Sequence, residues 1–76
     1  MNSIAVIGAG AWGTALGKVL GDKGYAVRLW ARRADQASAM ARDGENTRYL
    51  PGVRLPSTLV PTDSLEQALE GADLRR

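Results

Sequence analysis

The sequence predicts an α/β fold in which helices cover both faces of a parallel β-sheet. Residues 4–7 form a short apolar run with β-branched side chains, as in strands that are buried on both faces. Apolar residues then recur at helical spacing over 11–23, and a second apolar stretch follows at 26–30. Strand, helix and strand fit within about 30 residues, which is the size of one βαβ unit.

The helix between these strands is expected to end at Lys23, because Gly24 follows where a helix would stop. Its apolar residues at helical spacing are Ala15, Leu16, Val19 and Leu20. A second helix is predicted over 33–43, with Gly44 as its stop. Its thin apolar stripe consists of Ala34, Ala37, Met40 and Ala41.

The remaining chain predicts a long loop, a short helix and the beginning of another strand. Three prolines interrupt 45–61, which we interpret as an ordered loop with a short extended piece at 58–60. Asp63 and Glu66 have the spacing of a capping box, which predicts a helix that Gly71 ends. Residues 72–74 resemble the entry to a strand. The sheet is therefore expected to be truncated before it is complete, and the chain to be marginally stable alone.

Composition limits the classes of function. The chain has 76 residues, no cysteine and no histidine, which excludes disulfides, thiolate metal sites and the commonest general base. The net charge is only +2 and the basic residues are scattered, so the case for nucleic-acid binding is weak. No Lys or Arg precedes the apolar stretch 4–16, and glycines interrupt it, so a cytoplasmic location is expected.

A glycine-rich motif directly follows the first predicted strand. Residues 8–13 read Gly-Ala-Gly-Ala-Trp-Gly, the G-x-G-x-x-G pattern of Rossmann-like dinucleotide-binding units. Gly8 permits the tight turn, Gly10 lets a pyrophosphate approach the backbone, and Gly13 lets the helix pack closely on the sheet. The phosphates would meet unpaired N–H groups at the helix N-terminus. The alternative is a glycine-rich turn that binds nothing.

The end of the second strand points to the kind of dinucleotide. NAD-binding folds usually carry a carboxylate here, but this strand is followed by Arg32 and Arg33, and the next carboxylate is Asp35. A guanidinium group suits a 2′-phosphate, which favours NADP(H) or tolerance of both NADP(H) and NAD(H). The alternative is a pair of solvated arginines.

Three aromatic residues leave alternatives open. Trp12 lies inside the glycine motif and either covers a cofactor, contacts a neighbouring domain or packs in the core. Trp30 ends a strand, where packing on the sheet is expected. Tyr49 is interpreted as a loop anchor or as a lid residue beside the cofactor.

The chain resembles the amino-terminal part of bacterial NAD(P)-dependent glycerol-3-phosphate dehydrogenase. The resemblance rests on 4–16 with its Trp-containing glycine loop, on the Leu-Trp-x-Arg strand end within 27–32, and on the Asn-x-x-Tyr-Leu-Pro motif within 46–56. It continues through residues 62–74 and covers nearly the whole chain. Family members continue with an apolar strand where this chain has Arg75 and Arg76. That departure suggests a truncated product, a frameshift or an excised piece.

The resemblance implies hydride transfer between NAD(P)H and dihydroxyacetone phosphate, giving sn-glycerol 3-phosphate for glycerophospholipid synthesis. It implies that NADP(H) or NAD(H) is contacted by Gly8, Gly10, Ala11, Trp12, Gly13, Arg32, Arg33 and Tyr49. The family's catalytic lysines and substrate domain lie beyond residue 76. We therefore expect 1–76 to be a partial dinucleotide-binding domain without catalytic residues or a metal, inactive alone. The complete enzyme is expected to bind a small phosphorylated substrate, with no nucleic acid and no membrane span, and a homodimer is compatible with the resemblance. The alternative is a non-catalytic dinucleotide-binding fragment.

Overall fold

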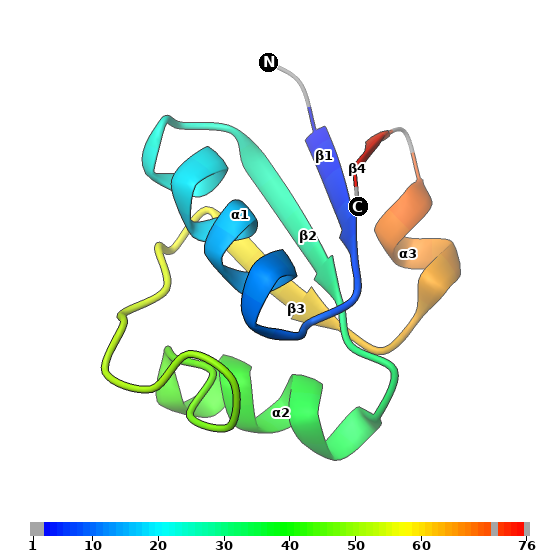
Figure 1. Ribbon diagram of the computed structural model, residues 1–76. Helices are drawn as coiled ribbons and strands as arrows, with labels where there is room; N and C mark the ends of the chain where they lie inside the picture. Colours follow the sequence, from blue (N-terminus) through cyan, green and yellow to red (C-terminus); the bar gives the residue numbers. More distant parts are fainter. Residues whose placement is uncertain (1–2, 71, 76) are drawn as a thin grey trace.

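Strands and helices alternate along the chain in the computed structural model, which describes residues 3–70 and 72–75 (Figure 1). The elements in order are β1 (Ser3–Ile7), α1 (Ala11–Asp22), β2 (Ala26–Trp30), α2 (Ala34–Asp43), β3 (Leu59–Thr62), α3 (Leu65–Leu69) and β4 (Ala72–Arg75). Each predicted element is present, with bounds that differ from the expected ones by a few residues at most.

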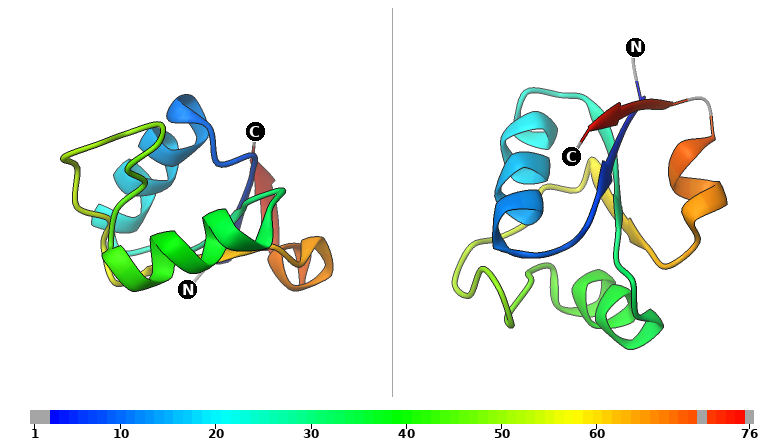
Figure 2. Two further views of the ribbon diagram at one scale, coloured as in Figure 1. Left: turned by 90° about the horizontal axis from the view of Figure 1, so that it is seen from below. Right: turned by 45° about the vertical axis from the view of Figure 1, so that its right-hand side comes forward.

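The four strands form one sheet in the order β3-β2-β1-β4, and each neighbouring pair is parallel. Ser3 pairs with Ala26 and Ile7 with Trp30, so β1 and β2 end at the same edge. Helices α1 and α3 lie on opposite sides of the sheet, as Figure 2 shows. The Rossmann-like α/β class is confirmed, and β4 extends the sheet beyond the first βαβ unit.

The core lies between the two central strands and α1. Ile4, Val6, Val27 and Leu29 are buried there. Side chains alternate along β2, so Arg28 lies on the other face of the sheet. There its guanidinium group donates to the carbonyls of Gln67 and Glu70 at the end of α3. Because a helix leaves its last carbonyls unpaired, Arg28 supplies partners for α3 across the sheet.

Helix α1 is buried through its small residues. Its buried positions are Gly13, Thr14, Gly17 and Gly21, whereas Val19 is exposed. A Cβ atom at Gly13 would overlap the Gly8 carbonyl oxygen, and one at Gly21 would lie 2.6 Å from Cγ of Pro56. The glycines thus let the helix backbone approach the sheet and the loop before β3 more closely than side chains would allow.

The start of α3 differs from the prediction. Asp63 was expected to cap this helix, but the N-cap is Ser64, whose Oγ accepts a hydrogen bond from the Gln67 N–H at 3.2 Å. The helix therefore begins one residue later than the Asp63–Glu66 spacing indicated. Serine is as good an N-cap as aspartate, so the local sequence offers two competing registers.

The loop after α2 is held by backbone hydrogen bonds. Gly44 ends α2 in the left-handed conformation with φ of 71°, as its position predicted. The Leu50 N–H donates to the Asn46 carbonyl at 2.8 Å, and the Leu55 N–H donates to the Gly44 carbonyl at 2.7 Å. The interpretation of an ordered loop is confirmed. Among the described residues, no helix has the length and apolar character needed to cross a membrane.

Substituting Gly13 by alanine tests the close approach of α1. The new methyl group would meet a backbone oxygen that cannot move independently, so Gly13→Ala should lower the free energy of unfolding by about 2 kcal/mol or more. Urea unfolding followed by circular dichroism measures the change. The control Val19→Ala, at an exposed position of the same helix, should change it by less than about 0.5 kcal/mol. Equal effects of the two substitutions would contradict the packing described here.

Candidate functional site

The candidate site is built around the turn between β1 and α1. Gly8 has φ of 108°, a conformation that side chains rarely adopt, and its N–H donates to the Trp30 carbonyl at 3.1 Å. This hydrogen bond fastens the turn to the end of β2. The carboxyl ends of the two central strands thus meet beside the start of α1, where parallel α/β sheets usually bind ligands.

The N-terminus of α1 offers unpaired donors beside open space. Gly10 is the N-cap, the described residues provide no side-chain cap, and the first turn carries no acidic residue. The first N–H groups of a helix have no partner within the helix and form the positive end of its dipole. A Cβ atom at Gly10 would meet nothing within 4 Å among the described residues. This cradle fits a phosphate group of a dinucleotide.

Two amide side chains hold the turn from distant parts of the chain. Nε2 of Gln36, in α2, donates to the Ala9 carbonyl at 3.1 Å. Nδ2 of Asn46 donates to the same carbonyl at 2.8 Å and to Oγ1 of Thr14 at 2.9 Å. Reading the sequence did not identify Asn46 as part of the site. The only signal was its place in the Asn-x-x-Tyr-Leu-Pro motif.

The predicted arginines follow β2 at the same edge of the sheet as the glycine turn. Both are exposed. Arg33 donates to the carboxylate of Asp35 at 3.2 and 3.3 Å, whereas Arg32 forms no ion pair with the described residues. An exposed pair contributes little to stability, so a stronger anion can displace Asp35. Arg32 could bind a phosphate without first breaking an ion pair to a described residue.

The aromatic residues occupy different surroundings. Trp12 is 74% exposed, so the core interpretation is wrong for the described part of the chain. Trp30 is half-buried in β2 and donates through Nε1 to the Asp63 carbonyl at 3.0 Å. Tyr49 is 42% exposed, and the guanidinium carbon of Arg48 lies 5.4 Å from its ring centroid, which is a cation–π distance.

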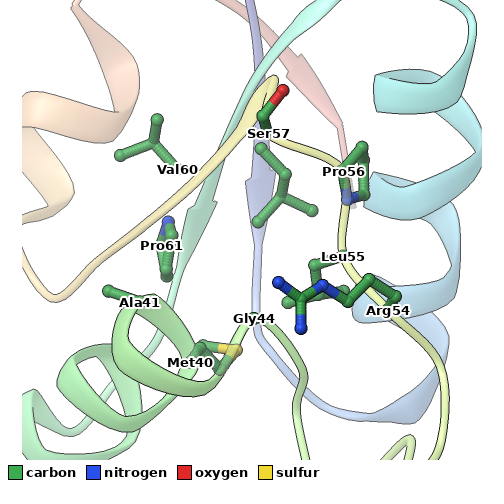
Figure 3. Close-up of a pocket in the computed structure, with 10 residues that line it drawn as sticks. Met40, Ala41, Gly44, Arg54, Leu55, Pro56, Ser57, Val60 and Pro61 are labelled. Carbon is green, nitrogen blue, oxygen red and sulfur yellow. The ribbon is translucent and has the colours of Figure 1, made fainter.

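Two hollows differ in their relation to the turn. One, of about 160 Å³, is lined partly by the residues that hold the turn, Gln36 and Asn46, and by the charged residues Arg33, Asp35, Glu45 and Arg48. A larger one, of about 470 Å³, lies between the end of α2 and β3 and is lined by Met40, Arg54 and Pro61 among others (Figure 3). No residue of the turn lines the larger hollow, so its size alone does not make it the site.

Comparison with known proteins supplies the family. The family model described as NAD-dependent glycerol-3-phosphate dehydrogenase N-terminus matches residues 3–75. The chain belongs to this family. It is 59% identical over 71 residues to the glycerol-3-phosphate dehydrogenase [NAD(P)+] of Thermus thermophilus and 57% identical over 72 residues to that of Desulfotalea psychrophila. These alignments cover 93% and 95% of this chain but only 22% and 21% of the relatives.

Solved structures of the family agree with this fold. The crystal structure of glycerol-3-phosphate dehydrogenase from Coxiella burnetii matches with a TM-score of 0.91 at 46% identity, over 96% of this chain and 23% of that one. The Plasmodium falciparum enzyme matches with a TM-score of 0.79 at 34% identity and the same coverage of both chains. The chain therefore spans about a fifth of the length of its relatives.

Proposed function

We propose that this chain is the dinucleotide-binding part of an NAD(P)-dependent glycerol-3-phosphate dehydrogenase. The observation that carries the proposal is the cradle at Gly10, where unpaired helix N–H groups border open space. Membership of the family supports the nature of the ligand, because its description names NAD. The proposed contacts are Gly8, Gly10, Ala11, Trp12, Gly13, Arg32, Arg33 and Tyr49.

In the complete enzyme, this part binds and orients the cofactor. Bound NAD(P)H supplies the hydride that reduces dihydroxyacetone phosphate to sn-glycerol 3-phosphate. The N–H groups of Ala11, Trp12 and Gly13 stabilise the pyrophosphate charge without a counter-ion, because they lie at the positive end of α1. Trp12 covers the cofactor or contacts the substrate domain, and Tyr49 borders the cofactor as a lid residue. Because these N–H groups are fixed in the helix, they hold the pyrophosphate in one place. The nicotinamide, which is covalently joined to it, is thereby confined to a small region.

The same proposal extends to the complete protein. Residues 1–76 form part of the dinucleotide-binding domain, and the substrate domain follows in the longer enzyme. The reaction serves glycerophospholipid synthesis in the cytoplasm, and the complete enzyme acts as a homodimer. The similarity to relatives of which the alignment covers only 21% and 22% supports this extension.

Gly10→Val tests the cradle. The backbone of Gly10, with φ of −75° and ψ of −173°, accepts any residue, and a Cβ atom there would meet no described atom within 4 Å. The fold should therefore persist, while the branched side chain occupies the phosphate approach and weakens NADPH binding at least about tenfold. Isothermal titration measures the affinity, and circular dichroism checks the fold. Unchanged affinity in a folded variant would refute the site.

Arg32→Glu tests the reading of the 2′-phosphate. Loss of a charge-assisted hydrogen bond should weaken NADPH by about tenfold or more, and NADH by much less. Arg54→Glu is the matched control, because Arg54 has the same charge but lines the larger hollow. Equal losses for NADPH and NADH would show that Arg32 does not distinguish them.

Incubation with both substrates tests the division of labour. The 76-residue chain should bind NADPH but should not consume it in the presence of dihydroxyacetone phosphate, because the proposed catalytic groups belong to the longer enzyme. Absorbance of the reduced nicotinamide follows the reaction. Turnover by the chain itself would show that its own residues catalyse the reduction. Absence of NADPH binding would refute the proposal that this chain binds the dinucleotide.

A further inference from the structure

Asn46 is a buried residue whose side-chain amide uses both of its N–H groups in hydrogen bonds. It is 2% exposed, and its Nδ2 group donates to the Ala9 carbonyl and to Oγ1 of Thr14. An amide nitrogen has two hydrogens, so both are satisfied. The two acceptors lie on either side of Gly10, one in the turn and one in the first turn of α1. The side chain of Asn46 therefore connects the turn before Gly10 with the first turn of α1.

The hydrogen bond to Ala9 sets the direction of a potential phosphate donor. In a planar trans peptide, the C=O and the following N–H point in opposite directions. Because the Ala9 carbonyl is directed at Asn46 and Gln36, the Gly10 N–H is directed away from them. This N–H forms no hydrogen bond with the described residues, and a Cβ atom at Gly10 would face open space.

The backbone of Asn46 anchors a second part of the proposed site. Its carbonyl accepts the Leu50 N–H at 2.8 Å, which closes the turn that carries Arg48 and Tyr49. Because the side chain of Asn46 is bonded to the glycine turn, this second turn is fastened to it. Among the described residues, the side chain of Gln36, by contrast, has a single hydrogen bond, to the Ala9 carbonyl.

We propose that Asn46 is a positioning residue for the dinucleotide. It orients the peptide between Ala9 and Gly10 for phosphate binding before the cofactor arrives, and it places the turn of Tyr49 beside that peptide. The proposal rests on the proposed dinucleotide-binding function. An aspartate could not perform this task when ionised, because a carboxylate only accepts hydrogen bonds and would face the Ala9 oxygen.

Asn46→Asp is the first test, made in the 76-residue chain with NADH, whose binding involves no 2′-phosphate titration. At neutral pH the affinity should fall at least about tenfold. It should recover partly as the pH falls, because the protonated carboxyl group can donate one hydrogen bond. The charged groups that line the adjacent hollow are Arg33, Asp35, Glu45 and Arg48, and they are the same in parent and variant. The recovery is therefore the difference between the two pH profiles.

Thr14→Val provides a second route that adds no charge. It removes the acceptor of one Asn46 hydrogen and should weaken NADH severalfold, whereas Thr14→Ser keeps the oxygen and should restore binding. The matched control is Thr58→Val. Oγ1 of Thr58 donates to the Gly21 carbonyl at 2.8 Å, a hydrogen bond between the same loop and the other end of α1. This control should lower stability without changing the affinity for NADH.

The chemical shift of the Gly10 amide, measured by NMR without any dinucleotide, separates this proposal from the function on which it rests. Asn46→Asp and Thr14→Val should move this resonance, and Thr58→Val should not. If the parent chain binds no NADH, the proposed function fails, and the Gly10 shift still tests the positioning. If folded Asn46→Asp keeps the parental Gly10 shift, or binds NADH with the parental affinity, the positioning role is overturned. A loss of affinity that Thr58→Val shares equally would also overturn it.

Discussion

The contact between the backbone of α1 and the turn after β1 is the constraint on which the rest of this structure depends. Gly13 lies so close to the Gly8 carbonyl that no Cβ atom fits between them. Gly17 and Gly21 continue the contact toward Leu59 and Pro56. The helix therefore starts directly over the ends of β1 and β2. That placement exposes its first N–H groups at the edge of the sheet, so one packing requirement produces both the fold and the cradle.

The region around the N-terminus of α1 has positive charge that no carboxylate in the first turn of the helix compensates. The first turn of α1 contains no carboxylate to compensate its dipole. The adjoining strand end supplies two arginines, of which Arg33 already pairs with Asp35. In the proposed function, backbone dipoles would bind the pyrophosphate, whereas an exposed guanidinium group would bind a 2′-phosphate. These two means differ in specificity, because fixed N–H groups recognise any diphosphate and a guanidinium group distinguishes a terminal phosphate.

Most of the fold could be predicted from local patterns, and the exceptions have physical causes. The strands at 4–7 and 26–30 and the stop at Gly44 have clear local signals, apolar β-branched runs and a glycine after a helical pattern, so they could be predicted from the sequence. The apolar repeat that predicted α1 supplies only part of its packed face: Leu20 packs against the core, whereas the fully buried positions are small residues and Val19 is exposed. At α3, Ser64 and Asp63 are equally suitable caps by residue type, so the sequence alone could not show that Ser64 is the N-cap. The role of Asn46 in the turn could not be predicted from local patterns, because its hydrogen-bond partners are 32 and 37 residues away.

The hydrogen bonds of Asn46 explain why the loop after α2 is ordered although it contains two prolines, Pro51 and Pro56, and little regular structure. Loops of this length without secondary structure are uncommon in compact domains unless they have a function. A buried amide must find partners, and Asn46 finds them only when the loop lies against the glycine turn. Burial of Asn46 therefore makes the order of the loop and the shape of the turn one equilibrium. A ligand that binds the ordered turn would then not have to order the loop as well. The conformational entropy of the loop is already lost before binding, which is what preorganisation means.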